Sequence, residues 1–326
     1  MSSLKEKAAK AYAKYVVWKT TKWAACPHET QEKVFKKLLI KGKKTHFGKE
    51  HSFEKIINHE DFSKLAPVRG YEGLKKYIKL IKEGEKDVLW PGRPIYFAKT
   101  SGTTSGEKLI PITKESMPYH VKGSVEATMH YINETSNTSF LNKKIIFLQG
   151  SPLLGEIKGI KTGRLSGIVA HYTPSFLRQN TMPSWETNCI EDWEKKVLEI
   201  SKETLKEDMA AIGGIPPWVI MYFEKLIEIT GKKTIKKIFP NFSLFVYGGV
   251  NYSPYKESFR QLIGEEVDSI EYYPASEGFF AYQDSQKEEG LLLQLNSGIF
   301  YEFIEIEEMK KNYPKRLTIN QVEKET

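Results

Sequence analysis

Residues 100–108, Thr-Ser-Gly-Thr-Thr-Ser-Gly-Glu-Lys, combine hydroxyl side chains, two glycines and a lysine in one short stretch. Glycine lets the backbone turn sharply and approach a ligand closely, and successive amide and hydroxyl groups can then converge on an anion. The stretch is not a P-loop of the Walker type, because three residues separate Gly102 from Gly106 and Glu107 precedes Lys108. A phosphate-binding loop for a nucleotide and an ordinary Ser/Thr/Gly surface turn both fit this pattern.

A second group of residues that could do chemistry is the segment 272–278, Tyr-Tyr-Pro-Ala-Ser-Glu-Gly, which follows an apolar run. The end of a strand is where α/β sheets commonly bind ligands. A tyrosine ring there could stack on a purine, and Ser276 could hold a phosphate oxygen. Glu277 could bind Mg²⁺, which favours a carboxylate shared with substrate phosphates. The alternative is a capped turn with an exposed glutamate.

Tyr247-Gly248-Gly249 also follows an apolar run. Its two glycines would let a flat ligand lie against the backbone. A plain turn that ends a strand is the alternative interpretation.

Apolar periodicity predicts which elements position these segments. Strands that alternate with helices indicate an α/β fold. The predicted helices are residues 4–25, a second one capped by Thr30, 61–65, 71–81 with Gly84 as a stop, 121–131, 184–205 and 219–229. The predicted strands are a short run before the loop, 144–148, 242–246, 270–273 broken by Pro274, and a hairpin of 291–295 with 299–306. Residues 45–48 are predicted as a turn and 155–167 as a long loop, and Pro111 and Pro118 are expected to limit regular structure.

Composition narrows the function classes. The chain has 326 residues, of which 40% are hydrophobic and 28% charged, so it is long enough to bury a substantial core. Its net charge of +8 is spread over lysine-rich helices, and without a zinc finger, an RNP segment or an arginine-rich strip we expect no nucleic-acid partner. The basic N-terminal helix is expected to pack on its own domain rather than on a membrane. Without a secretory segment or a long apolar run, we expect a cytoplasmic protein with no integral membrane contact.

The three segments together resemble, in order and spacing, the signature segments of adenylate-forming enzymes. The closer resemblance is to the acyl-acid amido synthetases of the auxin-responsive promoter family. Residues 45–48, Trp90, 214–218 and 300–304 support it, so the similarity runs from about residue 45 to residue 306. The resemblance implies the fold of the large N-terminal domain of such an enzyme, with mixed sheets flanked by helices and a hairpin near the C-terminus.

The resemblance also implies a two-step reaction. A carboxylic acid attacks the α-phosphate of magnesium ATP, which gives an acyl-adenylate and pyrophosphate, and an amine, typically an amino acid, then displaces AMP to form an amide. The phosphates would bind to Thr100, Ser101, Gly102, Thr103, Thr104, Ser105 and Gly106, with Lys108 beside them. The adenosine would contact Tyr273, Pro274, Ala275 and Ser276, with Mg²⁺ on Glu277 and with Tyr247, Gly248 and Gly249 at the border of the adenine and acyl pockets. The residues expected to act on the reacting groups are Ser101, Thr104, Lys108 and Glu277.

Residues of the acyl pocket are harder to identify from sequence. Candidates are Tyr119, His120 and Tyr131 on or near the helix after the loop, and Val250 after the double glycine. Simple packing explains the aromatic and histidine candidates equally well, and the same holds for His171.

The sequence also departs from the family pattern, because the family continues to a Gly-Asp motif that binds the ribose and to a mobile C-terminal cap. This chain has no Gly-Asp pair. We therefore expect residues 1–326 to form the adenylation-type N-terminal domain alone, with a helical segment (1–60) packed on it, a charged tail (307–326) and no cap domain. An acyl-CoA or acyl-protein synthetase and a non-catalytic module that binds a nucleotide or an acid stay open as alternatives.

Overall fold

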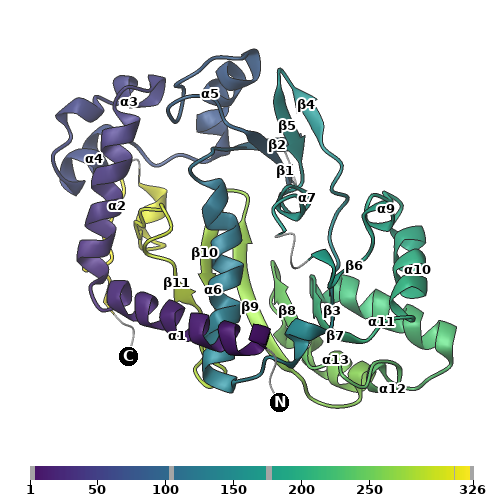
Figure 1. Cartoon of the computed structure of the whole chain (residues 1–326). Coiled ribbons are helices and arrows are strands. Elements are labelled where there is room, and N and C mark those ends of the chain that lie inside the picture. The colour runs from purple at the N-terminus through teal and green to yellow at the C-terminus, as the bar shows by residue number, and fades with distance from the viewer. Residues whose placement is uncertain (1–3, 103–105, 174–177, 312, 324–326) are drawn as a thin grey trace.

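The computed structural model of the chain describes residues 4–102, 106–173, 178–311 and 313–323, with residues 101, 102 and 106 described by their backbone only (Figure 1). The α-helices are α1 (Leu4–Ala24), α2 (Pro27–Gly42), α3 (His46–Glu50), α4 (His59–Leu65), α5 (Tyr71–Glu83), α6 (Met117–Thr135), α7 (Leu165–Ala170), α9 (Trp185–Asn188), α10 (Trp193–Thr204), α11 (Pro216–Thr230), α12 (Ile235–Ile238) and α13 (Lys256–Ile263). The strands are β1 (Tyr96–Gly102), β2 (Gly106–Ile112), β3 (Lys144–Phe147), β4 (Gly155–Ile157), β5 (Ile160–Gly163), β6 (Thr181–Met182), β7 (Met209–Gly213), β8 (Leu244–Gly248), β9 (Asp268–Ala275), β10 (Gly278–Tyr282) and β11 (Leu292–Leu293).

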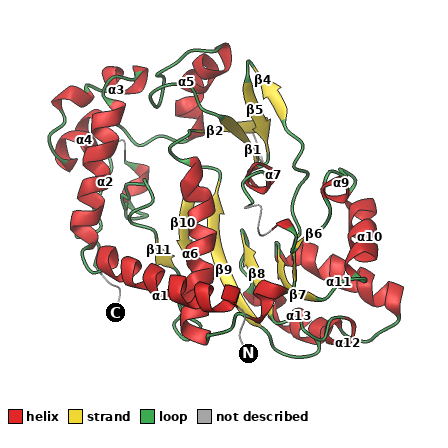
Figure 2. Cartoon of the chain, viewed as in Figure 1, coloured by secondary structure: helices red, strands yellow, loops and turns green. Residues whose placement is uncertain are grey.

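A seven-stranded sheet forms the centre of the larger part of the molecule, in the order β11-β10-β9-β8-β7-β3-β6 (Figure 2). Strands β9, β8, β7, β3 and β6 are parallel, whereas β10 runs antiparallel to β9 and β11 runs antiparallel to β10. The carboxyl ends of β3, β7, β8 and β9 therefore lie at one edge of the sheet, and the turn between β9 and β10 lies at the same edge.

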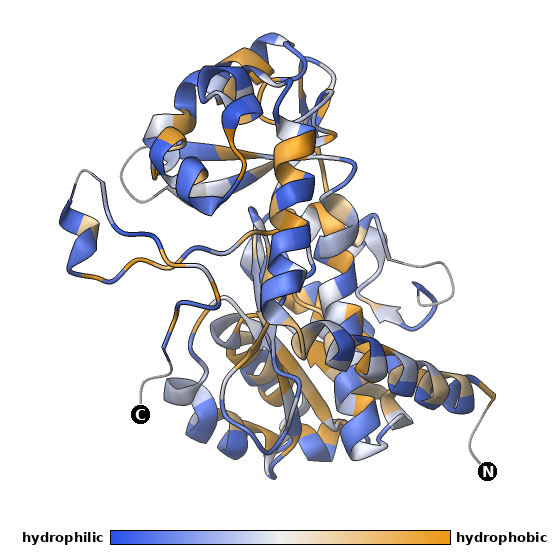
Figure 3. Cartoon of the chain, turned by 90° about the vertical axis from the view of Figure 1, so that its left-hand side faces the viewer, coloured by the Kyte–Doolittle hydropathy of each residue, from blue (hydrophilic) through white to orange (hydrophobic). Residues whose placement is uncertain are grey.

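Helices cover both faces of this sheet. On one face, Ile212 and Phe245 of the strands pack with Val197 of α10, Phe223 of α11 and Phe259 of α13. On the other face, α6 packs against the sheet and α1 packs on α6, with Ala13, Val16 and Ala127 in the shared core. Figure 3 shows apolar strands enclosed by helices whose outer faces are hydrophilic. The expectation that the N-terminal helix packs on its own domain is confirmed.

A second, four-stranded sheet has the order β2-β1-β5-β4 and lies above the carboxyl ends of β8 and β9 in Figure 1. Helix α5 covers it through Tyr77 and Ile81, which pack with Phe97 of β1. Helix α7 also packs against it, because Ile168 joins the core made by Ala98 and Ile112. The fold is thus α/β with two mixed sheets and flanking helices, as predicted.

Prolines are tolerated where the sequence predicts breaks. Pro111 lies within β2, which is the edge strand of its sheet, so the missing N–H is not needed. Pro118 occupies the first turn of α6, where the N–H has no partner within the helix. Pro274 continues β9 because the pairing with β8 ends at Tyr272 and only the β10 side remains paired. The predicted break at Pro274 and the predicted limits at Pro111 and Pro118 are therefore wrong.

Several short elements also differ from the prediction. Residues 46–50 form α3 instead of a turn, because the Thr45 side chain accepts a hydrogen bond from the Gly48 amide. Helix α2 begins at Pro27 after Cys26, so Thr30 lies inside the helix and does not cap it. The predicted helix 184–205 is split into α9 and α10, because Asp192 caps a new helix.

The largest errors concern strands. The stretch 155–167 is not a loop but contains the β4–β5 hairpin and the start of α7. The predicted hairpin of 291–295 with 299–306 is wrong, because β11 pairs with β10 instead. The hairpin near the C-terminus is formed by β9 and β10, which are joined through Ser276 and Glu277. Strand β7 was not predicted, although all its residues are buried at the centre of the sheet.

Among the described residues, no helix is both long enough and apolar enough to cross a membrane.

Candidate functional site

Two of the three predicted segments meet at the carboxyl edge of the seven-stranded sheet. Gly248 is paired with Tyr272, and a Cβ added to Gly248 would lie only 2.4 Å from the carbonyl oxygen of Tyr272 and 3.3 Å from Cδ of Pro274. Gly249 follows with φ of +83°, a conformation that favours glycine. The Tyr-Gly-Gly and Tyr-Pro-Ala-Ser-Glu segments are therefore neighbours, as the sequence predicts.

The turn between β9 and β10 presents the second segment to solvent. Ala275 pairs with Gly278, so Ser276 and Glu277 form the turn itself. The Glu277 side chain is exposed and has no hydrogen bond or ion pair to another described residue. The Tyr273 ring packs against Phe280 with centroids 5.5 Å apart and is still 55% exposed, which leaves one face free for a planar ligand. The turn therefore offers a free carboxylate beside a free aromatic face.

The third segment is the tip of the β1–β2 hairpin in the four-stranded sheet. Gly102 pairs with Gly106 across the hairpin, while Thr103, Thr104 and Ser105 lie outside the described residues. Thr100 pairs with Lys108, whose Nζ atom lies 5.5 Å from the centroid of the Tyr71 ring. Lys99 and Glu107, which directly precede Thr100 and Lys108, form an ion pair of 3.2 Å across the hairpin. The lysine predicted to neutralise phosphates thus lies on an aromatic ring at the base of the hairpin tip.

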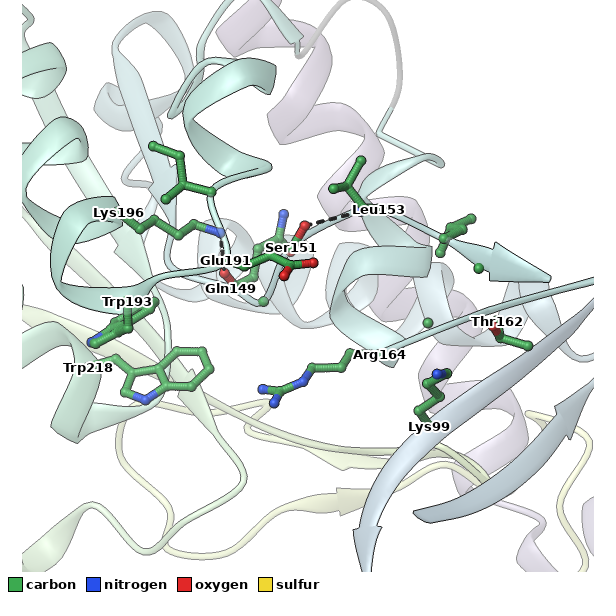
Figure 4. Close-up of a pocket in the computed structure, with 15 residues that line it drawn as sticks. Lys99, Gln149, Ser151, Leu153, Thr162, Arg164, Glu191, Trp193, Lys196 and Trp218 are labelled. Carbon is green, nitrogen blue, oxygen red and sulfur yellow. Dashed lines mark hydrogen bonds between the residues drawn. The ribbon is translucent and has the colours of Figure 1, made fainter.

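A cleft of about 720 Å³ separates the two sheets next to this hairpin (Figure 4). The four-stranded sheet contributes Lys99, Thr162 and Gly163 to it, and Gly102 lies three residues beyond Lys99, about 10 Å along the strand. The seven-stranded sheet contributes the residues that follow β3, together with α10 and the start of α11. Those residues are Gln149, Gly150, Ser151, Leu153, Leu154, Ile190, Glu191, Trp193, Lys196 and Trp218.

The strand order explains why a cleft opens here. After β3 the chain crosses to the four-stranded sheet, forms β4 and β5, and returns on the outer side of β3 as β6, whereas after β7 it proceeds in the other direction to β8. The loops after β3 and β7 therefore diverge, and such a switch point is where open α/β sheets bind ligands. Sequence reasoning missed this cleft because it missed β7, and the run Met-Ala-Ala-Ile-Gly before residues 214–218 is the signal that would have revealed it.

The floor of the cleft is held by a buried lysine. Lys196 of α10 is 1% exposed, and its ammonium donates to the carbonyl oxygens of Gln149 (3.0 Å) and Asn188 (2.6 Å). Burial lowers the pKa of Lys196 from 10.5 to about 8, because the charged form loses solvation. This lysine fixes the loop after β3, so its role is to shape the cleft.

The candidates for the acyl pocket lie in different surroundings. Tyr131 is fully buried, and its hydroxyl donates to Asp268 at the amino-terminal end of β9, away from the edge where the other segments lie. His120 is buried near the start of α6, and its Nδ1 has no hydrogen-bond partner among the described residues. Tyr119 lies against Gly298, and Val250 is exposed directly after Gly249. Tyr131 is therefore a packing residue, whereas His120 keeps an unused polar atom.

Two further aromatic or histidine predictions become packing residues. The Tyr247 ring is buried and stacks on Phe245, and its hydroxyl donates to Glu271 over 3.2 Å, so only the backbone of this segment reaches the edge. His171 bonds to the carbonyl oxygen of Pro152 over 2.9 Å and packs edge-on against Trp185. Neither side chain is free to bind a ligand at the edge.

Two solved proteins share this arrangement of sheets and helices. The fold is similar to that of GH3.15 acyl acid amido synthetase solved with 2,4-DB, with a TM-score of 0.64 and 15% identity over 89% of this chain and 57% of that chain. It is also similar to 2-hydroxyisobutyryl-CoA ligase solved with 2-HIB-AMP, with a TM-score of 0.53 and 11% identity over 83% of this chain and 53% of that chain. The chain thus spans about half the length of the solved proteins that it matches.

The chain belongs to the GH3 family, because the profile of the GH3 family N-terminal domain matches residues 19–190, more than half of its length. A stretch of 93 residues is 32% identical to the indole-3-acetic acid-amido synthetase GH3.2 of Arabidopsis thaliana, which covers 28% of this chain and 17% of that protein. The family resemblance expected from the sequence is confirmed. The profile match includes the β1–β2 hairpin and ends before β8 and β9.

Proposed function

We propose that this chain carries the acid-activating half of a ligase that consumes ATP. A carboxylic acid would attack the α-phosphate of ATP to form an acyl-adenylate, and an amino acid or other amine would then displace AMP and form an amide. The observation that best supports the proposal is the placement of the Tyr-Gly-Gly and Tyr-Pro-Ala-Ser-Glu turns at one sheet edge, below the glycine-rich hairpin. Membership of the GH3 family supports the same reaction class.

The residues of the edge suit a nucleotide. The exposed ring of Tyr273 would stack on adenine, and the glycine backbone of Gly248 and Gly249 would let the base approach closely. The residues of the hairpin tip, Ser101 to Gly106, would donate to the phosphates. Donors that are already in place stabilise the negative charge that develops during phosphoryl and nucleotidyl transfer.

Glu277 fits the proposed role as the Mg²⁺ ligand. Its carboxylate is exposed at the turn and has no protein partner among the described residues. No group of three or more His, Cys, Asp or Glu side chains within the described chain could hold a metal by itself. A single carboxylate is sufficient, because Mg²⁺ binds to one or two carboxylates together with substrate phosphates. When bound, the ion would neutralise charge on the phosphates.

Carboxylate-dependent exchange of radiolabelled pyrophosphate into ATP tests the first half-reaction. The purified chain is assayed with a panel of organic acids, and ATP affinity is measured separately by calorimetry. Glu277→Gln and Ser101→Ala should each weaken magnesium-ATP binding about tenfold, which corresponds to one lost charge-assisted hydrogen bond or metal contact. Glu224→Gln, on the exposed surface of α11, is the matched control. Unchanged ATP affinity in both site variants would refute the assignment.

The acceptor separates the proposal from its alternatives. Amide formed with an amino acid supports the amido synthetase, and thioester formed with coenzyme A identifies an acyl-CoA synthetase instead. ATP binding without any exchange identifies a non-catalytic nucleotide-binding module. The cytoplasmic location stays a prediction.

A further inference from the structure

Helix α1 has one face that packs on the protein and one face that does not. Its inner face buries Ala13, Val16 and Trp23, and the helix packs on α6 through this face. The opposite face leaves two large apolar side chains, Leu4 and Trp18, 85% and 54% exposed. In Figures 1 and 3 the helix lies on the outside of the molecule. Packing on the domain therefore uses only the inner face and does not determine what the outer face contacts.

The apolar residues of the outer face form one continuous stripe. Exposed apolar residues recur in alternating steps of four and three, a spacing that places them along one side of a helix. This α1 stripe consists of Leu4, Ala8, Ala11, Tyr15 and Trp18. The rings of Tyr15 and Trp18 have centroids 6.0 Å apart, and Tyr12 stacks on Tyr15 with centroids 6.2 Å apart. The stripe is about 20 Å long, at 1.5 Å per helical residue.

Lysines flank the α1 stripe. By helical spacing, the exposed Lys7 and Lys14 lie on one side of it and the exposed Lys19 lies on the other. The Nζ atom of Lys22 lies 3.5 Å from the centroid of the Trp18 ring. None of these four lysines forms an ion pair with another described residue. The only acidic residue of α1 is Glu6, which is half-buried and accepts a hydrogen bond from the Asn142 side chain, so the outer face carries four cations and no carboxylate.

We propose that the outer face of α1 docks the protein on an anionic phospholipid bilayer. The α1 stripe would lie at the boundary between headgroups and acyl chains, where tryptophan and tyrosine are favoured, and the lysines would contact the anionic headgroups. The helix would lie along the surface, because no helix among the described residues could cross a membrane. This inference does not depend on the proposed function.

Charge and shape favour a bilayer over other partners. A second copy docked through the same face would place lysines against lysines, which repel each other. A single-stranded nucleic acid could stack on the rings, but it would leave the aliphatic half of the stripe, Leu4, Ala8 and Ala11, in water. An anionic bilayer accepts both the aliphatic and the aromatic half of the stripe and also neutralises the lysines.

The position of α1 keeps it away from the cleft. The Lys5 ammonium donates to the carbonyl oxygen of Leu141, and Glu6 bonds to Asn142, just before β3 begins. The start of α1 therefore lies at the amino edge of the seven-stranded sheet. The cleft lies at the opposite, carboxyl edge, so a ligand in the cleft and a bilayer on α1 do not compete for the same residues.

Co-sedimentation of the whole chain with vesicles tests the inference. We expect binding to vesicles of equal parts phosphatidylcholine and phosphatidylserine and no binding to phosphatidylcholine alone, and salt should weaken the binding because it screens the lysines. The double substitution Lys7→Gln with Lys14→Gln should weaken binding about 25-fold, since each lysine near an anionic surface contributes about fivefold. The control Lys195→Gln with Lys256→Gln removes the same charge from exposed positions of α10 and α13, on the other face of the sheet, and should leave binding unchanged.

Fluorescence quenching by phospholipids with brominated acyl chains tests whether the α1 stripe enters the interface. Binding should quench the tryptophan fluorescence of the wild type, and Trp18→Phe should remove most of that quenching. Trp185→Phe, which replaces another exposed tryptophan, should retain it. Tyr15→Ser with Trp18→Ser should weaken binding to the anionic vesicles more than about tenfold. Thermal unfolding confirms that each variant is folded.

Four outcomes would overturn the inference. If the wild type does not sediment with the anionic vesicles, or if the α10–α13 control loses as much binding as the α1 lysine variant, α1 is not a membrane-docking face. If Trp18→Phe leaves the quenching unchanged, the stripe does not enter the interface. If the chain binds single-stranded oligonucleotides through the α1 lysines and does not bind vesicles, the face serves nucleic acid. Acid-dependent pyrophosphate exchange can persist in every case, because it is measured without vesicles.

Discussion

Replacement of His120 by leucine should change how the stability of the protein depends on pH. The imidazole is 5% exposed, and burial lowers its pKa from 6.5 to about 4. Its Nδ1 has no partner among the described residues, so the folded state gives the protonated ring no compensation. The unfolded chain therefore binds a proton at a higher pH than the folded chain does. As the pH falls from 6.5 towards 4, the wild type should lose stability through this residue.

The magnitude follows from the two pKa values. His120 has a pKa of 6.5 in the unfolded chain and about 4 in the folded chain. Proton linkage then lowers the free energy of unfolding by about 2 kcal/mol at pH ~5, and by about 3 kcal/mol well below both pKa values. A leucine at the same position cannot be protonated. His120→Leu should therefore be within about 1.5 kcal/mol of the wild type at pH ~8, and its stability should rise relative to the wild type by about 2 kcal/mol at pH ~5.

Urea unfolding of the wild type and of His120→Leu at both pH values measures how the difference between their stabilities changes with pH. His28→Gln, which removes an exposed imidazole, controls for the change in histidine number. If the stability difference between wild type and His120→Leu is the same at both pH values, His120 is not buried as a neutral ring. The acid concentration that gives half-maximal pyrophosphate exchange is a second readout, because it changes only if His120 also contacts the acid.

Two further substitutions test the frame that supports the site. Gly248→Ala places a Cβ 2.4 Å from the backbone oxygen of Tyr272, so we expect a loss of about 1–3 kcal/mol in urea unfolding together with weaker ATP binding. The control Gly73→Ala places its Cβ 3.2 Å from Cβ of Arg69, so it should cost less than Gly248→Ala. Equal effects of the two substitutions would contradict the predicted clash. Arg316→Gln breaks a buried two-point ion pair with Glu302 (2.9 and 3.0 Å) and should lower the free energy of unfolding by about 3 kcal/mol. The control Arg260→Gln removes an exposed guanidinium and should leave the unfolding midpoint unchanged. An unchanged midpoint for Arg316→Gln as well would show that its pair with Glu302 does not stabilise the fold.

The local sequence was sufficient to predict a helix or strand wherever that element depends mainly on its own residues. The predicted helix 71–81 is confirmed in α5, and Gly84 ends it with φ of +103° because glycine favours that conformation. The strand predicted at 144–148 is confirmed as β3, since Ile145, Ile146 and Phe147 are successive apolar residues and two of them are β-branched. The three glycine- and tyrosine-rich segments also indicated the family, because a sequence motif depends only on the order and spacing of residues along the chain.

Tertiary structure decided the features that depend on neighbours distant in sequence. Strand β7 is short and three of its five residues are alanine or glycine, and it is a strand because β3 and β8 pair with it on both sides. Pro274 is compatible with β9 only because β8 has already ended. Tyr131 is a candidate pocket residue by sequence, but it is 2% exposed and belongs to the core between the sheet, α6 and α1. The cleft between the two sheets depends on the divergence of the chain after β3 and β7, and that divergence exists only once the strand order is set by pairing.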